Sequence, residues 1–377
     1  MSGDRPALPP AYLPVSRHRH PLRLPAAGVD RRRTLSRLLA SREPSIRLNA
    51  RLSVLGEDPE SRSIQALREE VRSAPRTRAL LRTSLRPGRR TPWGIYHKWR
   101  GTHWALAHLA ELGYPPGDEA LQPSVDRVLD VWLRPSYFRE YEARTEKEAS
   151  RRFDAVPRAN GRYRRCASQQ GNALYYCSTL GLAPEGCDRL AERLMHWQWP
   201  DGGWNCDPDP QADTSSFGET LTPMVGLYVY GTSRRRPAAL AAARRASEVF
   251  LRRRLYRRVS DGRVIHPDFA ALHYPLYWHY DVLGGLKALA RMSLLGDPRC
   301  RDALDLLRSK EIPRGGWPAE RRFYDLPGER PRRGTDRVRW GALGPKSMNE
   351  WVTLDALWAL AGAGRINPRA LGARSGS

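Results

Sequence analysis

The sequence repeats one order of parts along most of its length, and no other feature constrains the fold as strongly. Each copy starts with a polar, amphipathic helix pattern and continues through a loop rich in Gly and Pro, often with a Trp. A second helix pattern rich in small and aromatic residues follows, and a Gly turn ends the copy. The six copies span residues 31–56, 63–113, 125–181, 187–231, 238–296 and 300–362. Repeated helix pairs are typical of solenoids and of closed rings.

The spacing of apolar residues predicts two helices in every copy. In the stretch 63–83, for example, Ile64, Leu67 and Val71 recur three or four positions apart, as the buried face of a helix requires. The first helices are predicted at 31–40, 63–85, 125–133, 187–199, 238–256 and 300–310. The second helices are predicted at 43–55, 101–112, 166–180, 215–230, 273–295 and 348–361. Period-two alternation, the signal of a strand, is scarce, so the expected fold class is all-α.

The lengths of the loops favour a closed ring over an open solenoid. Loops from a first to a second helix are long at 134–165 and 318–347, whereas the returning loops at 113–118 and 231–237 are short. Long loops gathered at one rim are a common way for a scaffold to present a site. The second helices also carry polar residues that a fully buried helix would avoid and a central cavity accommodates. They are Gln169, Gln170, Asn172, Glu219, His279, Asp281, Asn349 and Glu350.

We therefore predict a single-domain (α/α)6 toroid over residues 29–365, with its site where the inner helices meet at one end of the ring. Residues 1–28, rich in Pro, Arg and His, are predicted to form a disordered tail, and residues 366–377 a flexible one. No run of about 18 apolar residues occurs, so no transmembrane segment is expected. The first residues also lack the apolar core of a signal peptide. The five cysteines, an odd number without a CxxC pair, indicate reduced thiols and a cytoplasmic location.

The net charge of +24 raises the question of nucleic-acid binding. Only five of the 64 basic residues are lysines, a skew typical of the codon usage of a GC-rich genome. The arginines are spread along the whole chain rather than gathered on one element among aromatic residues. We therefore expect a solvated basic surface and no nucleic-acid partner, although such a surface attracts anionic ligands.

The segment from Gln198 to Trp204, with the sequence QWPDGGW, is the most specific stretch of the chain. Pro200 helps to end a helix, and Gly202 and Gly203 can adopt the positive φ of a tight turn. Trp204 is then free to fold back onto the helix end, where Gln198 can bond exposed carbonyls. A stabilising turn between repeats is therefore one interpretation of both residues.

The same segment resembles the QW repeat of the terpenoid cyclase and protein prenyltransferase superfamily, whose fold is an α/α toroid. Gln198, Gly202 and Trp204 match the spacing of that motif, and Gly315 and Trp317 match it again without the Gln. The resemblance implies a shared architecture over most of the chain and an apolar, isoprenoid-like substrate.

The catalytic signatures of that superfamily are absent from the sequence. Squalene-type cyclases protonate their substrate with a DxDD motif, whereas this chain has Asp207-Pro-Asp209-Pro. Protein prenyltransferases bind zinc through an Asp-x-Cys pair and a later His, and no Asp-x-Cys occurs here. The resemblance thus extends to the architecture and leaves the chemistry open.

Titratable and aromatic residues are densest between positions 266 and 281, at the predicted start of an inner helix. On a helix, Tyr277 and Asp281 would share a face, as would Trp278 and Asp281. A His, a carboxylate and aromatic rings together can supply acid–base chemistry and ring faces for a cation. The residues predicted to be catalytic are His273, His279, Tyr280, Asp281 and Glu219. The alternative is a polar and aromatic helix that packs against its neighbours.

Further clusters are predicted to face the same rim and to bind the substrate. Lys98 and Arg100 could hold an anion, although a loop with snorkelling side chains also explains them. Neutral side chains around Gln169 could bind a ligand or simply join neighbouring helices. The predicted substrate-binding residues are His97, Lys98, Arg100, His103, Trp104, Gln169, Gln170, Trp204, Asp207, Tyr274, Trp278, Asn349, Glu350 and Trp351.

Zinc-type ligands are present, but no HxxxH or CxxC spacing pairs them in the sequence. They are Cys206, Asp207, His266, His273, His279 and Asp281. We therefore expect no metal and no cofactor, with zinc or magnesium as the less favoured alternative. A GxSxG nucleophile motif, a phosphate loop and a dinucleotide fingerprint are also absent from the sequence.

Three functions are compatible with this sequence, which specifies no oligomeric state. The first is an enzyme that acts on an apolar or anionic, isoprenoid-like small molecule in a central cavity, where Trp and Tyr faces bind a prenyl chain or a carbocation. The second is a carbohydrate-active toroid, such as a polysaccharide lyase or hydrolase. The third is a non-catalytic toroid that binds a ligand or a partner. A deep apolar cavity would favour the first function, and an open polar groove the second.

Overall fold

The computed structural model describes residues 30–84, 91–150, 155–325 and 338–367, and in these ranges the chain is mostly α-helical. The expected all-α class is therefore confirmed at this level. The predicted N-terminal tail at 1–28 and most of the predicted C-terminal tail at 366–377 lie outside the described residues.

Both helices of every predicted repeat are present. The first helices are α1 (Arg31–Leu39), α3 (Arg62–Ser73) with α4 (Pro75–Ser84), α7 (Gln122–Trp132), α10 (Pro184–His196), α12 (Pro237–Leu251) and α14 (Arg301–Ser309). The second helices are α2 (Pro44–Asn49) continued by the π-helical η1 (Ala50–Val54), α6 (Thr102–Leu112), α9 (Ala167–Leu180), α11 (Phe217–Ser233), α13 (Val282–Arg291) and α15 (Glu350–Gly362). Shorter helices lie between them: α5 (Pro92–Tyr96), α8 (Glu146–Ala149), η2 (Glu119–Leu121), η3 (Pro135–Phe138), η4 (Pro267–Ala270) and η5 (Pro298–Cys300).

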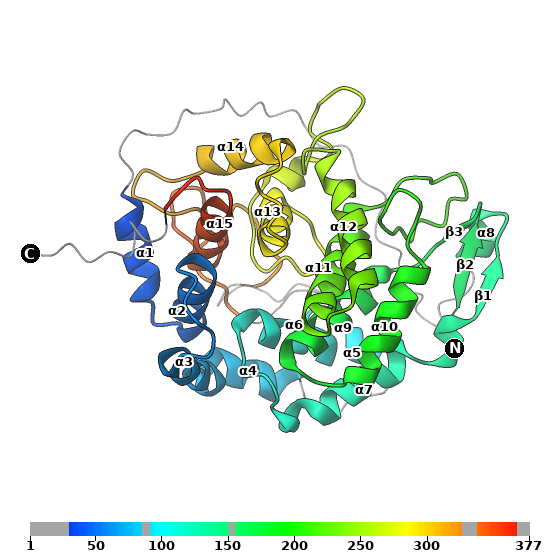
Figure 1. The fold of residues 1–377 in the computed structure, drawn as a ribbon, viewed down its shortest axis with the longest axis horizontal. Coiled ribbons are helices and arrows are strands. Elements are labelled where there is room, and N and C mark those ends of the chain that lie inside the picture. Colours follow the sequence, from blue (N-terminus) through cyan, green and yellow to red (C-terminus); the bar gives the residue numbers. More distant parts are fainter. Residues whose placement is uncertain (1–29, 85–90, 151–154, 326–337, 368–377) are drawn as a thin grey trace, which may run out of the picture.

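A small sheet occupies part of the long loop between α7 and α9. Its strands are β1 (Glu140–Glu142), β2 (Val156–Ala159) and β3 (Arg162–Tyr163), with β1 and β2 parallel and β2 and β3 antiparallel. The Glu140 carboxylate accepts a hydrogen bond from Trp197 Nε1 (3.1 Å) and lies 2.9 Å from His196 Nε2, at the end of α10. The sheet is thus attached at the edge of the helical body, as Figure 1 shows.

The second helices contact one another in cyclic order. Helix α6 touches α2 and α9, α11 touches α9 and α13, and α15 touches α13 and α2. Figure 1 shows α15 beside α2, with α1, α7 and α14 toward the periphery of the view. Side chains join the two ends of the repeat region, because Arg31 Nη2 donates to Glu311 (2.6 Å), 280 positions away, and Ser41 Oγ donates to Glu350 (3.1 Å).

Burial distinguishes the two sets of helices. Every residue of α6 except Glu111 is buried, whereas the outer α14 buries only a narrow apolar stripe. Helices α9 and α11 approach closely through glycines. A Cβ on Gly171 would lie 2.4 Å from the Pro223 nitrogen, and a Cβ on Gly226 would lie 2.4 Å from the Gly171 oxygen. Helices α9 and α11 therefore need small residues where they cross.

The two QW-like turns make the same contacts in two different repeats. Trp204 Nε1 donates to the Leu194 carbonyl in α10 (2.9 Å), and Trp317 Nε1 donates to a carbonyl of α14 (2.7 Å). Each Trp amide also donates to a threonine of the following inner helix, to Thr220 Oγ1 at 3.2 Å and to Thr353 Oγ1 at 2.9 Å. The turn therefore fixes where the next inner helix begins.

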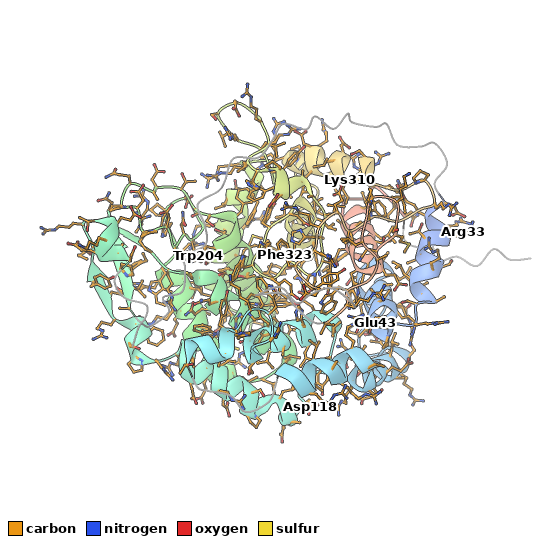
Figure 2. The ribbon with its side chains drawn as sticks, turned by 180° about the vertical axis from the view of Figure 1, so that it is seen from behind. Arg33, Glu43, Asp118, Trp204, Lys310 and Phe323 are labelled. Carbon is orange, nitrogen blue, oxygen red and sulfur yellow. The ribbon has the colours of Figure 1, made fainter. Side chains whose placement is uncertain are left out.

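Gln198 completes the first of these turns. Its Nε2 donates to the Gly202 carbonyl (2.7 Å) and to the Ala242 carbonyl in α12 (2.9 Å). Trp204 is 1% exposed and lies inside the helical body, whereas Arg33 lies at its edge (Figure 2). These contacts bear out the interpretation of a stabilising turn between repeats.

The prediction of an inner helix at 273–295 is wrong for its first residues, 273–281. The chain is irregular before Val282, where α13 begins, and Asp281 is its N-cap. Pro275 has no N–H to donate, and Tyr277 has a φ of +52°, so neither fits the interior of a right-handed helix. Tyr277 and Asp281 therefore do not share a helix face.

Two smaller differences have local causes. The single helix predicted at 63–85 is divided, because Ala74 precedes Pro75 and takes an extended conformation (ψ 145°) that ends α3. Gly231, predicted to end a copy, lies inside α11, where an added Cβ would meet Leu240 at 2.9 Å. Among the described residues, no helix is both long enough and apolar enough to cross a membrane.

Replacing Gly202 with Ala tests whether the turn depends on its glycine. Gly202 has a φ of +105°, and an added Cβ would lie 2.3 Å from the Arg245 carbonyl oxygen in α12. We expect Gly202→Ala to lower the free energy of unfolding by about 3 kcal/mol or more, because strain and a backbone clash add. Gly262→Ala is the matched control, since Gly262 also has a positive φ (+68°) but open space around it, and should cost about 1 kcal/mol. Equal losses in urea unfolding would contradict this account of the turn.

Candidate functional site

A cavity of about 110 Å³ lies between the inner helices. Its wall combines side chains of α6, α9, α11, α13 and α15 with the irregular segment that precedes α13. Five of the six inner helices thus contribute to one cavity, and the space between helices is a common place for ligand sites. This cavity is the best candidate for a functional site among the described residues.

Aromatic rings close the end of the cavity that lies near the N-termini of α6 and α13. Trp104 and Tyr277 line it. Trp99 packs against both rings, stacked on Tyr277 with 4.0 Å between centroids and edge-on to Trp104 at 4.8 Å. Beside this group, Lys98 Nζ lies 3.7 Å from the ring centroid of Trp278. Ring faces at this end can contact an apolar group or stabilise a positive charge.

Charged side chains line the cavity toward the C-terminal end of α6. Lys287 Nζ lies 2.7 Å from a Glu111 oxygen and 3.2 Å from an Asp355 oxygen. The side chains of Lys287, Asp355 and Glu111 are only 15%, 12% and 29% exposed, and all three line the cavity. Arg291 also lines it, with its guanidinium 5.3 Å from the ring of Tyr175 and 5.3 Å from that of Trp358.

Burial and mutual attraction shift the pKa values of these side chains in different directions. Burial alone would raise the pKa of Glu111, but Lys287 and Arg291 together lower it to about 2. Burial raises the pKa of Asp355 to about 6, against the attraction of Lys287 and with the help of Glu111. Burial opposes the charge on Lys287, but Asp355 and Glu111 outweigh it and raise its pKa. Asp355 is therefore a group of the cavity whose charge changes between about pH 5 and pH 7.

The residues predicted to be catalytic between His273 and Asp281 form a buried hydrogen-bond network. Asp281 Oδ1 accepts from the Gly284 amide (2.7 Å), and Oδ2 accepts from the His273 amide (2.8 Å) and lies 3.0 Å from His273 Nδ1. The Tyr280 hydroxyl donates to the Leu255 carbonyl (2.6 Å). The Gly284 contact ties the segment to the start of α13, the Leu255 contact ties it to the turn after α12, and the contacts of His273 with Asp281 brace the segment itself. These contacts favour the alternative interpretation, a packing role.

Two of the histidines predicted to be site residues are held neutral by their surroundings. His103 is fully buried, Trp132 Nε1 donates to its Nδ1 (3.3 Å), and burial lowers its pKa to about 3. His279 stacks on Phe323 with 3.5 Å between ring centroids, and burial, followed by the nearby His273, lowers its pKa to about 3. Figure 2 shows Phe323 near the middle of the molecule. Neither ring is protonated at neutral pH, so neither can act there as a general acid.

The structure brings only some of the predicted substrate-binding residues to the cavity. Trp104 and Tyr274 line it, and Trp351 stacks on Tyr274 with 4.9 Å between ring centroids. Asn349 instead caps α15, where its Oδ1 accepts from the Trp351 amide (3.0 Å), and Glu350 binds Ser41 as described above. The central cavity thus gathers a minority of the predicted set.

The remaining predicted residues lie apart from the cavity lining. Gln170 is buried, and in the orientation that satisfies its amide it accepts from Arg165 Nη2 (2.7 Å). Asp207 is exposed and accepts from the amide of Asp209 (3.0 Å). His97, Lys98, Arg100, Gln169, Trp204 and Trp278 also lie outside the residues that line it.

Sequence reasoning missed the charged half of the cavity. Glu111, Lys287, Arg291 and Asp355 each sit in an inner helix that is otherwise largely apolar. That contrast was the available signal, because a charge inside an apolar helix is rarely buried without a partner. Lys287 gave a second signal, since it is one of only five lysines in a chain whose other basic residues are arginines.

The metal-type donors named from the sequence do not gather in one place. Among the described residues, one group of three donor side chains lies close enough to hold an ion, and it comprises Cys166, Cys206 and Glu219. Cys206 alone was among the six donors named, and Glu219 was predicted as catalytic. Glu219 Oε1 accepts from Cys206 Sγ at 3.5 Å, and Oε2 accepts from the Ser168 amide at 2.9 Å.

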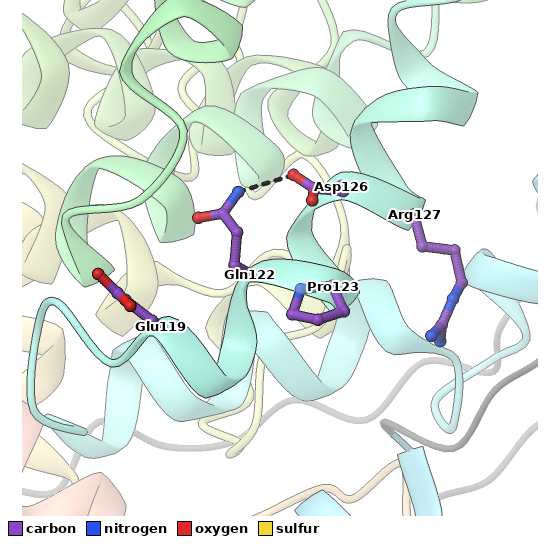
Figure 3. Close-up of a pocket in the computed structure, with 5 residues that line it drawn as sticks. All are labelled: Glu119, Gln122, Pro123, Asp126 and Arg127. Carbon is purple, nitrogen blue, oxygen red and sulfur yellow. Dashed lines mark hydrogen bonds between the residues drawn. The ribbon is translucent and has the colours of Figure 1, made fainter.

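A second hollow lies on the outer surface, over η2 and α7, and is lined by Glu119, Gln122, Pro123, Asp126 and Arg127 (Figure 3). Gln122 Nε2 donates to Asp126 Oδ1 (2.7 Å), so two of its polar groups already satisfy each other. Glu119, Pro123 and Asp126 are exposed. This hollow is a depression between partly or fully exposed side chains, and none of the five residues that line it is buried.

No protein-family model matches the chain, and no curated protein matches it. Membership of the terpenoid cyclase and prenyltransferase superfamily therefore stays a prediction. The functional argument rests on the geometry of the cavity and of the side chains around it.

Replacing Lys287 with Met tests whether the cavity depends on this buried cation. The change leaves Glu111 and Asp355 without their shared partner, and breaking a buried ion pair in this way typically costs about 3 kcal/mol or more. Lys147→Met is the matched control, because Lys147 is exposed on α8 and its loss should change stability by less than about 0.5 kcal/mol. Urea unfolding measures both variants, and a loss below about 1 kcal/mol in Lys287→Met would contradict the ion-pair account.

Proposed function

We propose that the chain is an (α/α)6 toroid, similar in architecture to prenyltransferases and squalene cyclases, that binds a small apolar, isoprenoid-like molecule in its central cavity. The cyclic order of the inner-helix contacts supports the ring. The two QW-like turns support the likeness, because both use the Trp indole and a threonine of the next inner helix in the same way.

The observation that carries the proposal is the contrast between the two ends of the cavity, one aromatic and one charged. Trp104 and Tyr277 offer ring faces at one end, and Lys287 and Asp355 offer a cation and a titratable carboxyl toward the other. A molecule with a branched apolar part and a single polar group matches both ends. Chemistry on such a ligand would use the rings to stabilise developing positive charge and Asp355 to exchange a proton.

The volume of the cavity limits the size of the ligand that it can hold. A dry cavity of about 150 Å³ accepts a benzene-sized molecule, so about 110 Å³ accommodates one five-carbon prenyl unit rather than a long chain. A polysaccharide would need an open polar groove, and the aromatic wall between the helices does not provide one. The cavity therefore favours the isoprenoid-like ligand over the carbohydrate alternative.

Ligand binding with a cavity-filling variant tests this function. We expect the five-carbon alcohol 3-methylbut-2-en-1-ol to bind in calorimetric titration and a disaccharide not to bind. Ala107 lines the cavity, so Ala107→Leu should weaken binding of the alcohol at least tenfold. Ala241→Leu, the same change at an exposed position of α12, should leave it unaltered.

The outcomes of this titration are distinct. If the alcohol binds, Ala107→Leu abolishes the binding and the prenyl compound is turned over, the protein is an enzyme. If the alcohol binds without turnover, the protein is a non-catalytic toroid. Binding of the disaccharide alone, or no binding of any short prenyl compound, contradicts the proposal.

The raised pKa of Asp355 predicts how the affinity for an anion changes with pH. At pH 7 the carboxylates of Glu111 and Asp355 balance Lys287 and Arg291. As the pH falls through about 6, Asp355 gains a proton and the cavity becomes net positive. The affinity for 3-methylbutane-1-sulfonate, which stays ionised throughout, should therefore rise several-fold between pH 7.5 and pH 5. Asp355→Asn should bind it tightly at both pH values, and an unchanged pH profile in this variant would rule out Asp355 as the titrating group.

A further inference from the structure

Three donor atoms outside the central cavity lie together near the N-termini of α9 and α11. They are the sulfurs of Cys166 and Cys206 and a carboxylate oxygen of Glu219, all within 4.8 Å of one another. In a tetrahedral zinc site, with Zn–S bonds of about 2.3 Å and Zn–O bonds of about 2.1 Å, the ligand atoms lie about 3.5 Å apart. The spacing is therefore close to that of three ligands of one ion.

Backbone contacts bring the two cysteines together from separate repeats. Cys166 is the N-cap residue of α9, and Cys206 lies two residues after Trp204 in the QW-like turn. The strand-like segments before them are joined, because the Arg165 amide donates to the Asn205 carbonyl (3.2 Å). The approach of the two thiols thus follows from the fold and not from flexible side chains alone.

Glu219 points between the helices instead of completing its own helix cap. Ser216 and Glu219 have the spacing of a capping box, in which the Glu normally reaches back to the N-cap amide. Here the Ser216 amide already donates to the Trp204 carbonyl (2.9 Å). The Glu219 carboxylate instead accepts from the Ser168 amide (2.9 Å) and from the Cys206 thiol (3.5 Å).

The surroundings of this group raise the pKa of two of its members, Glu219 and Cys206. Burial raises the pKa of Glu219, although the Ser168 amide opposes the shift. The Cys166 thiol, followed by burial, raises the pKa of Cys206. The Tyr96 hydroxyl interacts with all three groups, and its own pKa is raised by burial. A divalent cation would stabilise the carboxylate and the two thiolates, so its binding is coupled to loss of the thiol protons.

We propose that Cys166, Cys206 and Glu219 bind one Zn²⁺ through two thiolates and a carboxylate. Each thiol loses its proton to solvent as its sulfur binds, and no electron transfer is involved. Three protein ligands leave a fourth position for water or a substrate atom, which is the arrangement of zinc sites that take part in chemistry rather than in folding. The proposal does not depend on what the central cavity binds.

Titration of the reduced full-length chain with Zn²⁺ and with Co²⁺ tests this site. We expect one ion per chain, with release of two or three protons per ion. Co²⁺ should give thiolate-to-metal charge-transfer absorption and the intense visible bands of four-coordinate cobalt. These spectra are recorded on the unaltered protein, so the test stands even if a variant folds poorly. No stoichiometric binding, or bands of six-coordinate cobalt without thiolate absorption, would overturn the proposal.

Substitutions then assign the ligands. Cys206→Ser and Glu219→Gln should each weaken Zn²⁺ binding at least a hundredfold. Cys187→Ser is the matched control, because Cys187 belongs to the other close thiol pair, with Cys177, and should leave binding unchanged. Loss of binding in Cys187→Ser alone, or a Cys166–Cys206 disulfide that forms in the presence of equimolar Zn²⁺, would contradict the assignment.

Discussion

Lys287 of α13 contacts Glu111 of α6 and Asp355 of α15 at 2.7 and 3.2 Å. This ion triad constrains both the packing of the three helices and the polarity of the space between them. Charges taken out of bulk water cost several kcal/mol each unless they are paired. The three helices must therefore hold their relative positions, and the space between them cannot collapse into a purely apolar core. The cavity keeps a polar side for this reason, and the aromatic rings supply the other side.

The QW-like turns connect this centre to the periphery. Trp317 anchors Thr353 at the start of α15, two residues before Asp355, and Trp204 anchors Thr220 beside Glu219. Two turns with buried tryptophans thus set the register of two carboxylates on inner helices. The QW-like turn therefore has a structural role in this chain that requires none of the superfamily's catalytic residues.

The sequence predicted the helices well where apolar spacing was regular, and poorly where the backbone departs from it. All six helix pairs were expected, and the contacts of Gln198 and Trp204 follow from the physics of a Pro-Asp-Gly-Gly turn. The segment before Val282 was predicted as helix, because its polar and aromatic residues were assigned a helical face although Pro275 stands among them.

The candidate site was harder to predict for a physical reason. Positions rich in His, Tyr and Asp drew attention, but Asp281 and Tyr280 use their polar atoms to hold the chain, at 2.7 Å from the Gly284 amide and 2.6 Å from the Leu255 carbonyl. Glu111 and Asp355 stand singly in apolar helices, and only the packing of three helices brings them to one lysine. Such a site is encoded by tertiary contacts between repeats and not by a local motif.

A crystal structure of the chain soaked with 3-methylbut-2-en-1-ol tests the central claim most directly. The account predicts density for one molecule in the central cavity, with its methyl groups against Trp104 and Tyr277 and its hydroxyl toward Lys287 and Asp355. A cavity that holds only ordered water at saturating alcohol, or alcohol bound solely at the outer surface, would contradict it.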